Sequence, residues 1–182
     1  MKKIIFVILL SLPAIAVRSQ GNKSKRAELL EIKDIAVYQN FSFNNIKKFK
    51  KDSAVIADFA GQLLIVDIWF KECASCIAAF RNADSLQREY GDAIQFLLIT
   101  WDSEQQVRDH LSGAKAKLLP LISLPLPMIW KDSMAYFFFD FKKQPRLFFK
   151  INDKGNITHA WQGSLTRNII DYCLGRKEHW ED

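Results

Sequence analysis

The chain of 182 residues contains only three cysteines and three histidines. These residues are Cys73, Cys76, Cys173, His110, His159 and His179. A structural zinc site would need a second pair of ligands beside Cys73 and Cys76, and the remaining cysteine and histidines show no paired spacing. Covalent c-type haem needs a histidine directly after the second cysteine, where this chain has Ile77. The sequence therefore predicts no metal and no other cofactor.

The sequence also lacks internal repeats, low-complexity blocks and a dense basic surface. Its formal net charge is +6, but Lys2, Lys3 and Arg18 supply half of this charge near the N-terminus. The lysines of residues 47–51 have neither the density nor the interleaved aromatic residues of a nucleic-acid surface. We therefore expect one globular domain without a nucleic-acid partner.

The N-terminus has the pattern of an export signal. Lys2 and Lys3 precede an apolar run over residues 4–17, and small or polar residues follow around Ser19. This order is typical of a secretory signal peptide, and the apolar run is shorter than the roughly 20 residues of a membrane-spanning helix. We predict a signal peptide over 1–19 and a periplasmic or otherwise extracytoplasmic location. An uncleaved segment that anchors the chain to a membrane is the alternative.

Hydrophobic periodicity predicts alternating strands and helices after a polar tail. The tail covers residues 20–34, and an edge strand over residues 37–43 and a lysine-rich connection up to residue 58 follow it. Buried strands are predicted over 63–69 and 94–100, with helices over 76–90 and from about 102 to 111. The stretch 118–130 contains three prolines and receives no assignment. A short helix over 133–139, a hairpin of 146–151 with 157–162, and a last helix over 165–174 complete the prediction. This alternation favours an α/β sheet.

Cys73-Ala74-Ser75-Cys76 lies between the first buried strand and the first long helix. The unpaired N–H groups and the dipole of a helix start favour the thiolate form of a cysteine. Because the thiolate is the attacking species in disulfide exchange, and a second thiol three residues on can close on the first, the motif predicts redox chemistry.

The sequence around this motif resembles a known family. Residues 61–76, GQLLIVDIWFKECASC, are similar to the GKxxxxDFWAxWCxxC segment of exported thioredoxin-like proteins of the TlpA/ResA type. Residues 86–91 and 94–99 fit the same family, and QPRLFFKI over 144–151 matches its cis-proline segment. The resemblance covers about residues 35–175 and leaves 176–182 as a C-terminal tail. It implies a thioredoxin-like three-layer α/β/α sandwich with a mixed central sheet and an N-terminal extension.

The resemblance also implies roles for individual residues. Cys73 would be the nucleophile and Cys76 the resolving thiol, and the two would form the redox disulfide. Asp67 would exchange a proton with Cys76, for which burial suits it because burial favours the protonated form of a carboxyl group. Substrate binding would involve Trp69 beside the cysteines and the backbone of Gln144, exposed by a cis peptide bond at Pro145.

The function that the resemblance implies is thiol-disulfide oxidation and reduction. Its substrates would be disulfides of exported proteins, and a membrane-linked thiol donor would regenerate the reduced chain. Two departures leave the redox direction open. Glu72 replaces the family's usual tryptophan, and its charge opposes thiolate formation while that of Lys71 favours it. Ala74-Ser75 replaces the more usual Gly-Pro or Glu-Pro pair.

Two other functions are compatible with parts of the sequence. One is a redox-inactive binding protein of the same fold with a static disulfide, holding a partner at Gln144-Pro145 and the aromatic residues 136–139. The other is a peroxidase of the peroxiredoxin type. The sequence disfavours it, because that family needs Thr or Ser three residues before its reactive cysteine, where Phe70 stands here. Cys173 shares the apolar face of the last helix and is expected in the core.

Overall fold

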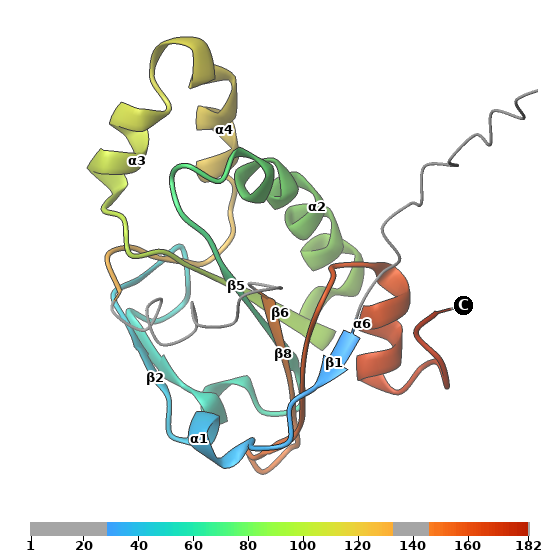
Figure 1. The fold of residues 1–182 in the computed structure, drawn as a ribbon. Coiled ribbons are helices and arrows are strands. Elements are labelled where there is room, and N and C mark those ends of the chain that lie inside the picture. The colour runs from blue at the N-terminus through green and yellow to red at the C-terminus, as the bar shows by residue number, and fades with distance from the viewer. Residues whose placement is uncertain (1–28, 133–145, 182) are drawn as a thin grey trace, which may run out of the picture.

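A mixed seven-stranded sheet forms the centre of the computed structural model, which describes residues 29–132 and 146–181 (Figure 1). The strands lie in the order β1-β9-β8-β5-β6-β7-β3. Their bounds are β1 Leu29–Glu31, β3 Ile46–Lys47, β5 Leu63–Ile68, β6 Ile94–Ile99, β7 Met128–Ile129, β8 Arg146–Ile151 and β9 Ile157–Gly163. Strands β5, β6 and β7 are parallel, and all other neighbours pair antiparallel. The predicted mixed α/β architecture with flanking helices is confirmed.

Different elements cover the two faces of the sheet. One face carries the helices α2 (Ala74–Tyr90), α3 (Glu104–His110), α4 (Leu119–Ile122) and α6 (Arg167–Leu174), with the 3-10 turns η2 (Gly91–Ala93) and η3 (Gly113–Leu118) between them. The other face carries α1 (Ala36–Gln39), the 3-10 helix η1 (Ile56–Phe59) and a small sheet of β2 (Ser42–Asn44) and β4 (Ser53–Val55). Figure 1 shows α2 and α6 on one side of the central strands and α1 and β2 on the other.

Strand β5 is buried on both faces, as its continuous apolar sequence predicts. Leu63 and Ile65 belong to the core under α2, whereas Leu64 and Val66 belong to the core on the opposite face. Side chains alternate between the faces of a strand. Asp67, two residues after Ile65, therefore points to the α2 side.

The predicted helices begin and end at recognisable capping residues. Cys73 is the N-cap of α2, and Gly91 ends that helix with a φ of 54°. Ser103 caps α3 by accepting a hydrogen bond from the N–H of Gln106, and Thr166 caps α6 in the same way. The helices predicted over 76–90, from about 102 to 111, and over 165–174 are confirmed as α2, α3 and α6.

The β8–β9 hairpin is also confirmed, and its turn depends on one glycine. Gly155 has a φ of +77°, and a Cβ added there would lie 2.7 Å from the Cβ of Ala57. Only glycine meets both conditions. The turn therefore packs directly on η1 on the face of the sheet opposite α2.

The predictions for residues 29–59 are largely wrong. The expected edge strand over 37–43 is replaced by α1 and the first two residues of β2, and the expected connection to residue 58 contains β3, β4 and η1. Residues 29–31, placed in the polar tail by the sequence, pair with β9. These elements depend on distant partners. The Gln39 side chain, for example, accepts a hydrogen bond from the N–H of Ile157 and donates one to the carbonyl oxygen of Gly155.

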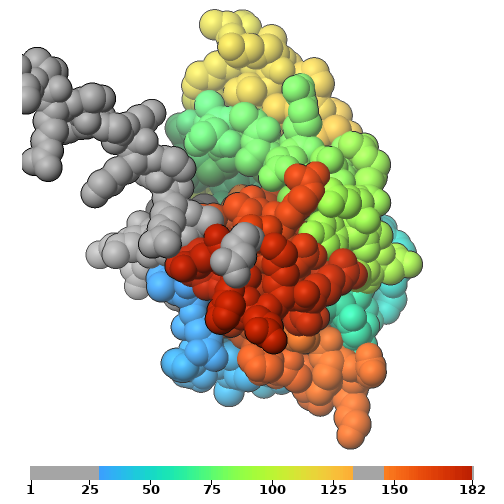
Figure 2. Space-filling model, turned by 90° about the vertical axis from the view of Figure 1, so that its right-hand side faces the viewer, coloured from blue at the N-terminus to red at the C-terminus, as the bar shows by residue number. Residues whose placement is uncertain are grey.

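Helix α6 is tied to the end of α2. Arg167 forms an ion pair with Glu89 at 2.7 Å, and the Tyr90 hydroxyl donates to Asp171 at 3.0 Å. Figure 2 shows the C-terminal residues, in red, between blue residues from early in the chain and green residues. No helix within the described ranges is long and apolar enough to span a membrane. The predicted signal peptide and the helix over 133–139 lie outside these ranges.

Candidate active site

Cys73 and Cys76 form a disulfide at the N-terminus of α2. The S–S distance is 2.08 Å and the Cα atoms are 5.3 Å apart. Sγ of Cys73 accepts a hydrogen bond from the N–H of Cys76 at 3.2 Å and lies 3.5 Å from Oγ of Ser75. Both cysteines are partly exposed, and Cys76 packs against the core under α2. In the reduced chain, the same N–H group and the helix dipole would favour a thiolate at Cys73.

Asp67 lies at the carboxyl end of β5 and is paired with an arginine. Arg146 stands directly opposite it on β8. Nε and Nη2 of Arg146 donate to the same oxygen, Oδ2 of Asp67, at 3.1 and 2.6 Å. The Asp67 side chain is 4% exposed and that of Arg146 is 13% exposed. The structure therefore holds a largely buried ion pair on the sheet face that α2 covers.

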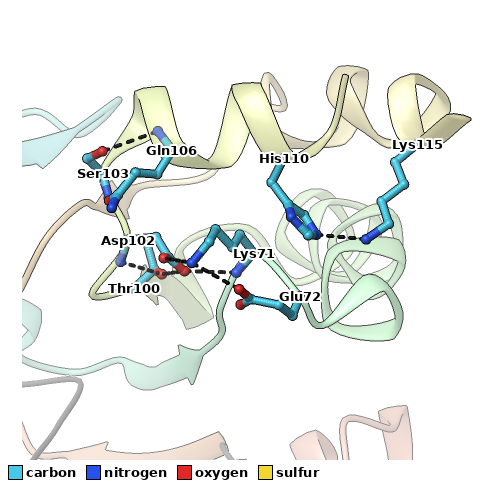
Figure 3. Close-up of polar contacts among 8 residues, drawn as sticks. All are labelled: Lys71, Glu72, Thr100, Asp102, Ser103, Gln106, His110 and Lys115. Atoms are coloured by element: carbon cyan, nitrogen blue, oxygen red, sulfur yellow. Dashed lines mark hydrogen bonds and ion pairs between the residues drawn. The ribbon is translucent and has the colours of Figure 1, made fainter. Parts of the chain in front are cut away.

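A second buried carboxylate, Asp102, holds the loop that leads to Cys73 (Figure 3). Asp102 lies just beyond β6, and its side chain is 3% exposed. Oδ2 accepts from the backbone N–H of Lys71 at 2.9 Å, and Oδ1 accepts from the Lys71 ammonium at 2.8 Å. The hydroxyl of Thr100 accepts from the N–H of Asp102 at 3.2 Å. These contacts tie the residue two positions before Cys73 to the end of the neighbouring strand.

Lys71 also forms an ion pair with Glu72. Oε1 of Glu72 lies 3.0 Å from the Lys71 ammonium. The hydrogen bond from Lys71 lowers the pKa of Glu72 below its ordinary value, and the hydrogen bonds to Asp102 and then to Glu72 raise the pKa of Lys71. Lys71 is therefore held by two carboxylates and is not available to stabilise a Cys73 thiolate. The N–H of Cys76 at the start of α2 contacts Sγ of Cys73 and can supply that stabilisation.

The Trp69 side chain is fully buried beneath α2, and it is not exposed on the protein surface. Its ring meets Phe80 of α2 and Trp130 edge to face, at centroid distances of 5.1 and 5.5 Å. Its indole Nε1 is buried and has no hydrogen-bond partner among the residues that the structure describes. In this conformation Trp69 supports the helix that carries the cysteines, and a direct contact with substrate stays a prediction.

Cys173, the third cysteine, lies in the core as expected. It is fully buried on α6, and burial raises the pKa of its thiol to about 12. The predicted substrate-binding residues Gln144 and Pro145 lie outside the described ranges. Within residues 29–132 and 146–181, no three His, Cys, Asp or Glu side chains are arranged to hold a metal ion.

Comparison with known proteins gives matches in structure only. No family model matches the chain, and no curated protein matches its sequence. A DsbF homologue from Corynebacterium diphtheriae is 11% identical with a TM-score of 0.52, over 87% of this chain and 96% of its own. A secreted Mycobacterium tuberculosis disulfide oxidoreductase homologous to E. coli DsbE is 11% identical with a TM-score of 0.51, over 78% and 98%. DsbF of MTB is 12% identical with a TM-score of 0.50, over 76% and 96%.

The chain has the thioredoxin fold. The fold predicted from the CxxC segment and the residue 144–151 segment is thus confirmed, and the Cys73–Cys76 disulfide occupies the start of its first long helix. The neighbours of this thioredoxin fold include the secreted disulfide oxidoreductase and the DsbF proteins named above.

Two residues of this thioredoxin fold were missed by the sequence analysis. Arg146 and Asp102 both contact candidate site residues, Asp67 and Lys71 respectively. The sequence did indicate that Asp67 has a partner, although not which one, because Asp67 is the one ionisable residue of the otherwise apolar β5. Charged residues are almost never buried unless they are paired. Asp102 gave no such signal, because an acidic residue before a helix is common.

Proposed function

We propose that this chain is a thiol-disulfide oxidoreductase that acts on disulfides of exported proteins through Cys73 and Cys76. The observation that carries the proposal is the disulfide at the N-terminus of α2, with Cys73 as the N-cap residue. The buried carboxylate of Asp67, on the sheet face beneath the same helix, supports it. The secreted disulfide oxidoreductase of the same fold supports it further.

In the reducing direction, Cys73 begins the reaction as a thiolate. Its sulfur attacks one sulfur of a substrate disulfide, so that a Cys73–substrate disulfide forms and the first substrate thiolate leaves. The N–H groups at the start of α2 stabilise the negative charge on Cys73 before the attack. Partial exposure of Cys73 allows a protein substrate to reach it.

Cys76 completes the reaction from the first turn of α2. Its thiol gives up a proton, for which the carboxylate of Asp67 is the base, and the resulting thiolate attacks Sγ of Cys73. The Cys73–substrate bond breaks, the Cys73–Cys76 bond forms, and the second substrate sulfur leaves with the electron pair. The substrate has then gained two electrons, and a thiol donor must return two electrons to the chain.

The partners follow from the same chemistry. An extended substrate segment would pair with the backbone at Gln144, next to Pro145. Export through the predicted signal peptide over 1–19 would place the chain among oxidised proteins, where regeneration needs a membrane-linked thiol donor.

Reaction with glutathione disulfide tests the function. The reduced full chain should release glutathione and recover the Cys73–Cys76 disulfide. Cys76→Ala should accumulate one glutathione on Cys73, detected by mass spectrometry, and Cys73→Ala should accumulate none. Cys173→Ala is the matched control and should behave as the unchanged chain. If Cys73 of the folded, reduced chain does not react, the chain is instead a binding protein with a static disulfide.

A further inference from the structure

Arg146 contacts one of the two carboxylate oxygens of Asp67. Both hydrogen bonds from Arg146 end on Oδ2, and Oδ1 accepts none from the residues that the structure describes. A buried carboxylate without a cation takes up a proton, because burial disfavours its charged form. The Arg146 guanidinium stays charged at any pH that a protein experiences. The ion pair compensates the buried charge of Asp67 through Oδ2 and leaves Oδ1 open.

Among the residues that the structure describes, Arg146 is the cation in contact with Asp67. Strand β6 contributes no ionisable side chain, since its residues are Ile94–Ile99. Strand β8 contributes Arg146 and Lys150, but Lys150 pairs with Leu63, four residues before Asp67 along β5. The ionisable side chains that α2 turns inward are Cys76, Asp84 and Tyr90. Of these, Asp84 has its own partner in Arg88, at 2.6 Å.

We propose that Arg146 is a positioning residue for the closing of the disulfide. Its guanidinium holds Asp67 by Oδ2 and fixes the carboxylate in place, so that Oδ1 can take the proton of Cys76. This inference rests on the proposed function. It assigns to the residue directly after Pro145 a role in proton transfer, in addition to any role of that segment in binding substrate.

The step balances within the chain and its substrate. The proton of Cys76 Sγ moves to Oδ1 of Asp67, and the Cys76 thiolate attacks Sγ of Cys73. The Cys73–Cys76 bond forms as the bond from Cys73 to the substrate sulfur breaks. That sulfur leaves with the electron pair and is protonated by water. Arg146 exchanges no proton and only holds Asp67, the base, in place.

The two halves of the reaction can be observed separately with dithiobis(nitrobenzoate), an aromatic disulfide, added to the reduced full chain. Attack by Cys73 releases the first nitrothiobenzoate, and attack by Cys76 releases the second. Arg146→Gln should slow the second release about tenfold at about pH 7 and leave the first unchanged. The difference should shrink at high pH, where solvent hydroxide can take the proton of Cys76 in place of Asp67.

Three variants complete the test. Arg146→Lys should restore most of the second rate. In an Asp67→Asn chain, the further change Arg146→Gln should have no additional effect, because no base is left to hold. Arg88→Gln removes the cation from Asp84 and should leave both rates unchanged. Equal second rates for Arg146→Gln and the unchanged chain, or an equal loss in the Asp67→Asn background, overturn the inference. If the unchanged chain releases no first nitrothiobenzoate, the proposed function itself fails.

Discussion

Two buried aspartates flank the cysteine motif, and they are held in different ways. Asp67 ends β5 and Asp102 follows β6, the parallel strand beside it. Asp67 receives hydrogen bonds from one side chain, Arg146 of β8. Asp102 receives one bond from the backbone N–H of Lys71 and another from the ammonium of the same residue. The contact of Asp67 with Arg146 joins two side-chain charges, whereas the contact of Asp102 with the N–H of Lys71 fixes the path of the backbone.

This difference separates two contributions to one site. Asp67 lies on the sheet face that α2 covers, where we propose that it acts as the base for Cys76. Asp102 lies under the loop that enters α2, where it holds the position of Cys73. Both hydrogen bonds from Arg146 end on Oδ2 of Asp67, so that Oδ1 is left for chemistry. Both oxygens of Asp102, in contrast, hold Lys71 in place.

Removing the cation from Asp67 should have the largest effect. Arg146→Met is expected to lower the free energy of unfolding by about 3 kcal/mol at neutral pH, because it leaves a buried carboxylate without its partner. The double variant Asp67→Asn with Arg146→Met should recover most of this loss. Urea unfolding of the oxidised chain measures both. If the double variant loses as much as the two single variants together, Asp67 and Arg146 do not act as a pair.

Removing Asp102 should have an intermediate effect on stability and a different effect on the reaction. Asp102→Ala is expected to cost about 2 kcal/mol, because the backbone N–H of Lys71 loses its acceptor. The ammonium of Lys71 can regain water, since that side chain is 27% exposed. The release of the first nitrothiobenzoate should slow more than the second, because the position of Cys73 is affected.

Asp109 offers a control for Asp102 on an exposed turn of α3, where it accepts a hydrogen bond from Gln105. Asp109→Ala should change neither stability nor rate by a measurable amount. A slower second release in Asp102→Ala, with the first unchanged, would mean that the assignment of the two aspartates is reversed.

Replacement of Glu72 should have the smallest effect. Glu72 lies on the exposed side of Lys71, the lysine that Asp102 also contacts. The Lys71 hydrogen bond lowers the pKa of Glu72 below 4.5, so its contribution to stability is present at neutral pH and is lost as the pH falls below that value. The raised pKa of Lys71 acts in the opposite direction, and its contribution is lost only above 10.5. Melting temperatures of Glu72→Gln and the unchanged chain should differ slightly at neutral pH and converge in acid. A difference that grows in acid contradicts this sign.

The sequence predicted the centre of the fold because the relevant signals are local. The apolar run of β5, the capping residues of α2 and α3, and the turn at residues 152–156 each lie within a few residues of the element they define. Residues 29–59 were predicted poorly because β1 and β3 are two or three residues long and pair with strands far along the chain. Such short strands form only when the rest of the sheet is present.

The same distinction holds for the candidate site. The cysteines and Asp67 could be identified from one continuous segment, because their spacing matches a family pattern. The ion pair of Asp67 could not, because its partner is 79 residues away. The opposing charges of Lys71 and Glu72 could not be weighed from sequence, because the outcome depends on Asp102, 31 residues from Lys71. The structure shows that Asp102 and Glu72 share the lysine.

A redox titration tests the central claim most directly. The folded full chain is equilibrated in glutathione buffers of increasing reducing strength, alkylated, and analysed by mass spectrometry. The account predicts one two-electron transition in which Cys73 and Cys76 become labelled together, while the buried Cys173 stays unlabelled because burial raises the pKa of its thiol to about 12. A Cys73–Cys76 disulfide that persists at every buffer composition until the chain is unfolded would contradict the account.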